Sequence, residues 1–223
     1  MRVLVVAAHP EPTSFTAALA ATAARVLGEA GHAVDLLDLY AEGFDPVGGP
    51  HDVRERADGT RFAYQREQAH AAARRGFAPA LQRQVDRLVA ADALLLHFPL
   101  WWFGMPAILK GWIDRTFAFG VAYGPGQAYD TGPFRGRRAM VALTTGGPEA
   151  AFTAAGRSGP LDWHLYPLEH GVLRFAGYDV VPRFVAWSAA RVDDAARAAY
   201  LETYAARLRA FEQTPPMRFP AGA

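Results

Sequence analysis

The chain contains no cysteine, which excludes disulfide bonds, thiolate nucleophiles and metal sites with cysteine ligands. It has a single lysine, Lys110, so its basic charge comes almost entirely from arginine. The 23 basic and 22 acidic residues leave a net charge of +1, which argues against a nucleic-acid-binding surface. No apolar run approaches the ~20 residues of a membrane-spanning helix, and the N-terminal run is too short for a secretory signal. We therefore expect a cytoplasmic protein without membrane insertion and without a nucleic-acid partner.

Several motifs of common enzyme classes are also missing. No G-x-G-x-x-G turn follows the first apolar run, so the standard dinucleotide cradle is absent. The P-loop pattern and the G-x-S-x-G turn of serine hydrolases are absent too. The seven histidines show no metal-ligand spacing, and we expect His97, at the end of an apolar run, to be a core residue.

Apolar runs alternate with helical patterns along the whole chain. Runs typical of strands buried on both faces occupy residues 3–8, 34–39, 93–98, 139–143 and 179–186. Amphipathic patterns predict helices over residues 13–30, 79–90, 107–117, 163–175 and 193–213. Five such units predict an α/β fold, a flavodoxin-like doubly wound five-stranded parallel sheet with helices on both faces.

We see no internal repeat or linker, and we expect a single domain over residues 1–223. Long loops are expected near residues 41–76 and 119–136, and a C-terminal tail at 214–223. The charged run from Arg54 to Arg75 is expected to face solvent.

Three loops follow the first, third and fourth predicted strands, and they should meet at one edge of the sheet. The first loop carries His9, Thr13, Ser14 and Thr16 ahead of a helix, whose N-terminal amides and dipole suit a phosphate. The alternative is that Thr13 or Ser14 only caps this helix.

The second loop contains three consecutive aromatic residues after Pro99 and Leu100, namely Trp101, Trp102 and Phe103. They form a platform on which a flat ligand could stack, unless they are ordinary core residues. The third loop consists of Thr144, Thr145, Gly146 and Gly147, and its two glycines let backbone amides approach a ligand. The alternative there is a plain glycine turn.

With these residues in place, the chain resembles the flavin-dependent NAD(P)H:quinone oxidoreductases, the DT-diaphorase family. The most specific segment is Pro-Leu-Trp-Trp-Phe-Gly-Met-Pro-Ala-Ile-Leu-Lys-Gly-Trp, within residues 98–116. Weaker matches follow the family's order over nearly the whole chain, at residues 8–15, 129–134, 144–147, 163–177 and 213–219.

The resemblance implies bound FAD, with FMN as the alternative, and a homodimer with two sites at its interface. It implies that NAD(P)H reduces the flavin and that a quinone or similar electron-poor aromatic then takes two electrons in the same pocket, in ping-pong order. It places the flavin phosphates and nearby atoms at His9, Ser14, Phe15 and Thr16, and the pyrophosphate or adenine side at Arg197. The isoalloxazine ring would lie along residues 99–103, with its polar edge at residues 144–147. The substrate pocket would include Trp102, Phe103, Phe175 and, from the other subunit, Tyr123.

Three positions depart from the family pattern, two at the flavin edge and one in the pocket wall. Phe152 and Ser158 stand where the best-known members have a tyrosine and a histidine that manage charge at the flavin edge. Pro125 likewise replaces a second tyrosine of the pocket wall. Our hypothesis is that the amides of Gly146 and Gly147 stabilise the charge of the reduced flavin, while water or Ser158 supplies the proton.

Two other function classes share this fold. The first is a regulatory subunit of a potassium efflux system, which has a similar aromatic loop. The second is a one-electron carrier, but such carriers are usually shorter and acidic. The length of the chain and residues 129–134 favour the enzyme.

Overall fold

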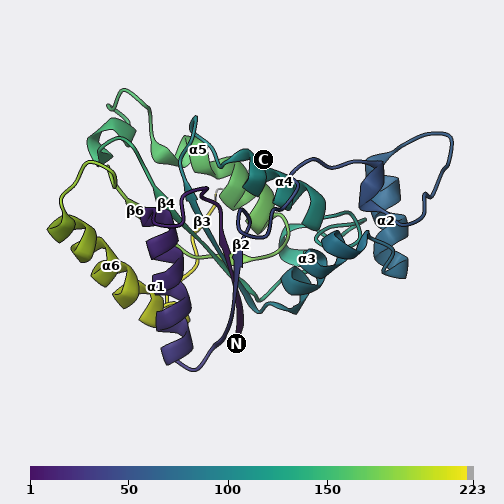
Figure 1. The fold of residues 1–223 in the computed structure, drawn as a ribbon, viewed down its shortest axis with the longest axis horizontal. Coiled ribbons are helices and arrows are strands. Elements are labelled where there is room, and N and C mark those ends of the chain that lie inside the picture. The colour runs from purple at the N-terminus through teal and green to yellow at the C-terminus, as the bar shows by residue number, and fades with distance from the viewer. Residues whose placement is uncertain (220–223) are drawn as a thin grey trace.

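A computed structural model describes residues 1–219, in which one parallel β-sheet lies between two layers of helices (Figure 1). The sheet has the order β2-β1-β3-β4-β5, and a further short strand, β6, also pairs with β4. All of the pairings are parallel, so the predicted flavodoxin-like fold is confirmed. The strands are β1 (Arg2–Ala7), β2 (Ala33–Asp38), β3 (Ala93–Pro99), β4 (Arg138–Thr144), β5 (Asp179–Val180) and β6 (Phe184–Ala186).

Helices cover both faces of this sheet. On one face α1 and α6 lie side by side, and Leu19 and Tyr204 pack with Val5 of β1 (Figure 1). On the other face Trp112 of α4 packs with Leu96 of β3. The helices are α1 (Phe15–Glu29), α2 (Tyr64–Arg74), α3 (Pro79–Ala90), α4 (Ala107–Thr116), α5 (Leu161–Leu168) and α6 (Asp194–Arg209). Shorter helical segments are η1 (Pro50–Asp52), η2 (Tyr129–Thr131), η3 (Glu149–Phe152) and the π-helix η4 (Glu169–Arg174).

Two predicted elements are interrupted at prolines. The strand expected over residues 179–186 is an edge strand divided into β5 and β6 at Pro182, where its register against β4 shifts by one residue, from Val180 opposite Ala139 to Phe184 opposite Ala142; edges and such irregularities are where sheets accommodate proline. The helix expected over residues 163–175 begins earlier, at Leu161, and contains Pro167. Since proline removes a helical donor, α5 gives way to the π-helix η4 just after it.

The long loop expected near residues 41–76 contains a helix, α2, which lies at the opposite end of the view from α1 and α6 (Figure 1). The expectation that this charged segment faces solvent is wrong for Glu67, whose residue is 0% exposed. Its carboxylate lies 3.0 Å from Nε of Arg56 and accepts a hydrogen bond of 2.6 Å from the amide of Ala57. The buried carboxylate is therefore paired, which is the condition under which charges are found inside proteins.

The C-terminal tail is attached to the sheet, since the amide of Met217 donates to the carbonyl oxygen of Val180 at 2.7 Å. Residues 220–223 of the expected tail lie outside the described residues. Over residues 1–219, none of the helices is both long and apolar enough to cross a membrane.

Candidate functional site

The loops after β1, β3 and β4 meet at the carboxyl edge of the sheet and enclose two adjoining cavities. The first, of about 550 Å³, is lined by His9, Thr13, Ser14, Phe15, Thr16, Pro99, Leu100, Trp101, Thr144, Thr145, Gly146, Ala189, Ala190 and Arg197. The second, of about 410 Å³, is lined by Leu100, Trp102, Phe103, Gly146, Gly147, Pro148, Ala151, Phe152, Arg157, Ser158 and Arg191. The cavities share Leu100 and Gly146 and together form one groove. Most of the predicted site residues border this groove.

One end of the groove is the N-terminus of α1. Ser14 does cap this helix, because its hydroxyl accepts a hydrogen bond of 3.1 Å from the amide of Ala17. The amides of Phe15 and Thr16 have no acceptor within residues 1–219, which is the usual condition of the first helical turn. The capping and phosphate-binding interpretations are therefore compatible, since the cap leaves two donors for a ligand.

The side chains of His9 and Thr16 are fixed by protein contacts at the same end. Nδ1 of His9 accepts a hydrogen bond of 3.0 Å from the amide of Glu11, so this tautomer carries its proton on Nε2, as a donor. The hydroxyl of Thr16 is buried and lies 3.1 Å from the hydroxyl of Thr144. This contact joins the start of α1 to the end of β4, and it commits the Thr16 hydroxyl to the protein.

The turn after β4 presents two amides to the middle of the groove. The hydroxyl of Thr145 donates to the carbonyl oxygen of Gly147 at 2.7 Å and accepts from the amide of Ser188 at 3.2 Å. The amides of Gly146 and Gly147 have no acceptor within residues 1–219. A Cβ at Gly146 would meet no atom within 4 Å, so this position borders open space. The turn is thus held by Thr145 and offers donors to a ligand.

The turn after β3 holds its aromatic residues in an unfavourable conformation. The amide of Trp101 donates to the carbonyl oxygen of Gly104, and the amide of Gly104 donates to the carbonyl oxygen of Trp101, both at 3.0 Å. These two hydrogen bonds close a two-residue turn. Trp102 and Phe103 have positive φ angles of 49° and 60°, and they are 97% and 47% exposed. Such a conformation costs on the order of 1–3 kcal/mol per residue and is concentrated at functional sites. The alternative that these residues are ordinary core is wrong.

Aromatic side chains from two segments line the second cavity, namely Trp102 and Phe103 after β3 and Phe152 on η3, and further rings pack behind them. The ring of Phe103 lies 4.7 Å from the ring of His164, and the ring of Phe152 lies 5.5 Å from that of Trp187. Nε2 of His164 bonds the carbonyl oxygen of Ser158 at 2.8 Å. His164 was not predicted as a site residue. Only its place in the helical pattern after Ser158 could have indicated it.

Tyr123 and Phe175 do not border the groove. Their rings lie 5.7 Å apart beside a separate cavity of about 500 Å³ that Tyr123 lines together with Gln65 and Gly171. Nε2 of Gln65 donates to the hydroxyl of Tyr123 at 3.1 Å, which leaves the phenolic proton available to another acceptor. Within one chain, the two parts of the predicted substrate pocket are therefore separate.

Arg197 lines the first cavity, but its guanidinium is engaged with the protein. It donates to the carbonyl oxygens of Ala189 and Val192, and it forms an ion pair of 2.5 Å with Asp194. These contacts fix the loop before α6, so Arg197 presents a largely compensated charge to the groove.

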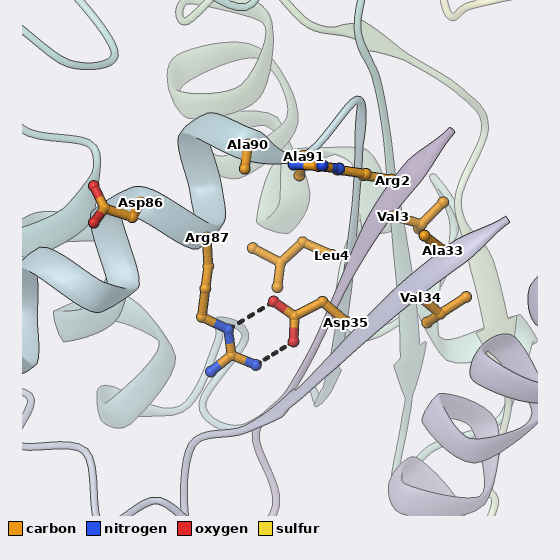
Figure 2. A pocket seen from close by; sticks show the side chains of 10 residues that line it. All are labelled: Arg2, Val3, Leu4, Ala33, Val34, Asp35, Asp86, Arg87, Ala90 and Ala91. Carbon is orange, nitrogen blue, oxygen red and sulfur yellow. Dashed lines mark hydrogen bonds and ion pairs between the residues drawn. The ribbon is translucent and has the colours of Figure 1, made fainter.

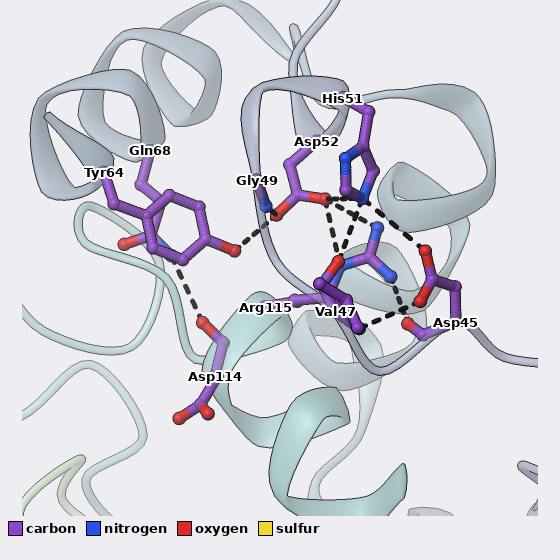
Figure 3. A network of polar contacts seen from close by, with 9 residues as sticks. All are labelled: Asp45, Val47, Gly49, His51, Asp52, Tyr64, Gln68, Asp114 and Arg115. Carbon is purple, nitrogen blue, oxygen red and sulfur yellow. Dashed lines mark hydrogen bonds and ion pairs between the residues drawn. The ribbon is translucent and has the colours of Figure 1, made fainter. Parts of the chain in front are cut away.

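A buried ionic network fixes the segment that leads to Gln65 (Figure 3). Nη2 of Arg115, on α4, lies 2.6 Å from the carboxylate of Asp52, whose residue is 1% exposed. The hydroxyl of Tyr64 donates to the same carboxylate, and burial together with this charge raises the pKa of Tyr64. Because Tyr64 begins α2, the network also positions Gln65 and, through it, Tyr123.

A further cavity of about 370 Å³ lies at the amino ends of β1 and β2, on the opposite edge of the sheet (Figure 2). Its two carboxylates are paired, since Asp35 lies 2.6 Å from Arg87 and Asp86 lies 2.7 Å from Arg75. We interpret it as a crevice between α3 and the edge strand. No cluster of histidine and carboxylate side chains suited to a metal ion occurs among residues 1–219.

Comparisons with known proteins agree with this architecture. A family model described as a flavodoxin-like fold matches residues 1–208. The rat protein NAD(P)H dehydrogenase [quinone] 1 is 35% identical over 219 residues, which are 98% of this chain and 80% of that protein. Human ribosyldihydronicotinamide dehydrogenase [quinone] is 32% identical over 217 residues, 97% of this chain and 94% of its own.

A solved structure from Klebsiella pneumoniae, described as that of a quinone reductase, has a TM-score of 0.93 and 36% identity. The similarity covers 98% of this chain and 88% of that one. The resemblance inferred from the sequence is thus confirmed over nearly the full length. The chain belongs to the NAD(P)H:quinone oxidoreductase family of flavodoxin-like enzymes.

Proposed function

We propose that the protein is a flavoprotein that uses NAD(P)H to reduce quinones or similar electron-poor aromatics. The observation that carries this proposal is the groove, which has unpaired amides at one end and a strained aromatic turn at the other. A flavin bound there would accept two electrons from NAD(P)H and pass them to the acceptor. None of the relatives named above is a subunit of a potassium efflux system, so we do not pursue that alternative.

The residues of the groove fit FAD. The amides of Phe15 and Thr16 and the Nε2 proton of His9 would hold the phosphate groups, because a helix N-terminus favours negative charge. The aromatic turn at Trp102 and Phe103 would lie against the isoalloxazine ring. FMN is the alternative, because it needs only the α1 end of the groove for its single phosphate.

Two functions are assigned to the turn after β4. The amides of Gly146 and Gly147 would donate to the polar edge of the ring, where negative charge develops on reduction. Phe152 can pack against the ring but cannot donate a proton, so the proton at this edge would come from water or from Ser158. The pairing of His164 with the Ser158 carbonyl would keep the loop of these two residues in place.

A second copy of the chain would complete the substrate pocket. Trp163 on α5, next to His164, is 71% exposed, and Trp102 in the aromatic turn is 97% exposed; aromatic side chains of this kind are enriched at protein–protein interfaces. In a homodimer, Tyr123 and Phe175 of one protomer would face the groove of its partner. The hydroxyl of Tyr123, oriented by Gln65, would then donate to a carbonyl oxygen of the acceptor. NAD(P)H and the acceptor would use this pocket in turn, in ping-pong order. The cytoplasmic location stays a prediction.

The decisive experiment uses the purified protein. We expect a yellow preparation that releases FAD, identified by its mass, and that loses its colour when NADH or NADPH is added without oxygen. A quinone added next should restore the colour, and initial rates at several quinone concentrations should give parallel double-reciprocal lines. Sedimentation should show a dimer. A colourless protein that takes up neither FAD nor FMN would contradict the proposal.

A further inference from the structure

Two arginines at the rim of the second cavity have no partner. Arg157 and Arg191 both line this cavity, beside Phe152 and Ser158. Both are exposed, and neither side chain forms an ion pair or hydrogen bond within residues 1–219. Arg197, which lines the first cavity, differs from them because Asp194 compensates its charge.

No carboxylate lines the same cavity, so the two positive charges are not balanced locally. The amides of Gly146 and Gly147, which line the same cavity, add two donors without a protein acceptor, and the hydroxyl of Ser158 can also donate. An uncompensated set of donors and cations around a concave surface favours an anion.

The backbone at both arginines is well fixed. Beside Arg157, the amide of Ser158 donates to the carbonyl oxygen of Ala151 at 2.9 Å. The amide of Arg191 donates to the carbonyl oxygen of Ser188 at 2.7 Å. The backbone therefore anchors both side chains at the cavity rim, and their guanidinium groups remain free to contact a ligand there.

We propose that Arg157 and Arg191 stabilise the reduced, negatively charged form of the ring that occupies the second cavity. This inference rests on the proposed function. A hydride from NAD(P)H brings two electrons and one proton, so a neutral ring that accepts it gains one negative charge. Guanidinium keeps its charge at every physiological pH, and it supplies attraction without transferring a proton. The chain thus places fixed charge beside Phe152, which cannot donate a proton.

The expected consequence is tighter binding of the reduced flavin relative to the oxidised flavin. Because both guanidinium groups are exposed and screened by salt, we expect each to change this affinity ratio by up to about fivefold rather than by several orders of magnitude. A fivefold change in the ratio corresponds to about 20 mV in the midpoint potential of a two-electron couple.

The test measures the midpoint potential of the flavin in the purified holoenzyme, by equilibrium titration against a reference dye. Arg157→Gln and Arg191→Gln should each lower the potential by up to about 20 mV, and the double variant should lower it further. Arg157→Lys should retain most of the wild-type potential. Arg209→Gln, at the far end of α6, removes the same charge from an exposed position and should leave the potential unchanged.

Three results would overturn the inference. One is a wild-type potential in the double variant with flavin fully bound. Another is that the arginine variants have an unchanged potential but a higher KM for a sulfonated quinone, with no change in KM for a neutral quinone. That result would assign the arginines to binding of the acceptor. The third is a wild-type protein that takes up no flavin, which would end the proposed function as well. The first two leave the proposed function intact, so the failures are distinguishable.

Discussion

Replacing Gly146 with alanine should strengthen the fold and weaken flavin binding. The backbone at Gly146 is not left-handed, and a Cβ there would meet no atom within 4 Å. Alanine therefore fits the apoprotein without strain. It also restricts the unfolded chain, which stabilises proteins by about 0.4–1 kcal/mol at compatible positions.

The same methyl group would occupy space that we assign to the ring edge of the flavin. Overpacking of a close contact costs typically about 1–3 kcal/mol, which corresponds to a loss of roughly five- to 150-fold in flavin affinity. The two effects have opposite signs, so a general loss of structure cannot produce both. This distinguishes Gly146 from Gly156, where a Cβ would lie 2.4 Å from the carbonyl oxygen of Ala151 and would disturb the fold itself.

The assay needs two measurements on apoprotein, namely urea unfolding and the dissociation constant for FAD from the quenching of flavin fluorescence. Gly28→Ala is the matched control, because Gly28 lies in α1 away from the groove and a Cβ there also meets nothing within 4 Å. It should raise stability and leave the dissociation constant unchanged. If Gly146→Ala binds FAD as tightly as wild type does, the ring edge does not lie at this turn.

Three further predictions follow from single groups. Phe152→Tyr should raise the rate of quinone reduction several-fold by supplying a hydroxyl, and an unchanged kcat would show that the hydroxyl is not limiting. Burial lowers the pKa of His97 from 6.5 to about 4, so the unfolded chain binds a proton that the native protein does not. Stability should therefore be complete above pH ~6.5 and fall by about 3 kcal/mol as the pH drops to ~4, and His97→Gln should abolish this dependence in urea titrations. Arg115→Met should lower the free energy of unfolding by about 3–5 kcal/mol, because it leaves the buried carboxylate of Asp52 unpaired. Lys110→Met, which breaks an exposed ion pair on the same helix, should lower it by under ~1 kcal/mol. Equal losses in urea unfolding would contradict a stabilising role of the network.

The sequence predicted those features that depend on local pattern and on the geometry of parallel sheets. The apolar runs of β1 and β3 identified strands buried on both faces, and His97 is indeed in the core. Because parallel strands place their carboxyl ends at one edge, the loops at His9, Trp101 and Gly146 were expected together, and they line one groove. The prediction was reliable here because each step used contacts close in sequence or a topology with few alternatives.

Long-range contacts were not predictable in the same way. Asp52 and Arg115 are 63 residues apart, and nothing in the local sequence indicates that one pairs with the other. The same holds for Gln65 and Tyr123, which are joined only because α2 returns to the loop after α4. The unfavourable turn at Trp102 was also hidden, because aromatic residues in sequence suggest core, whereas here the hydrogen bonds of Trp101 hold Trp102 outward.

The two ends of the groove are formed by different chemical groups, backbone amides at the start of α1 and loop side chains around the second cavity. At α1 the free donors are backbone amides, which any sequence able to form that helix supplies, so the phosphate binding that we propose there would depend on the fold more than on side chains. Around the second cavity the charged and aromatic groups are side chains of loops, which can be exchanged without disturbing the sheet. Phe152 and Ser158 could therefore stand where the family resemblance implies a tyrosine and a histidine without disturbing the cofactor site that we propose. If the scaffold keeps the ring in place, the loss of a proton donor has to be met by other groups of the same loops, and Arg157 and Arg191 are the charged side chains that line this cavity.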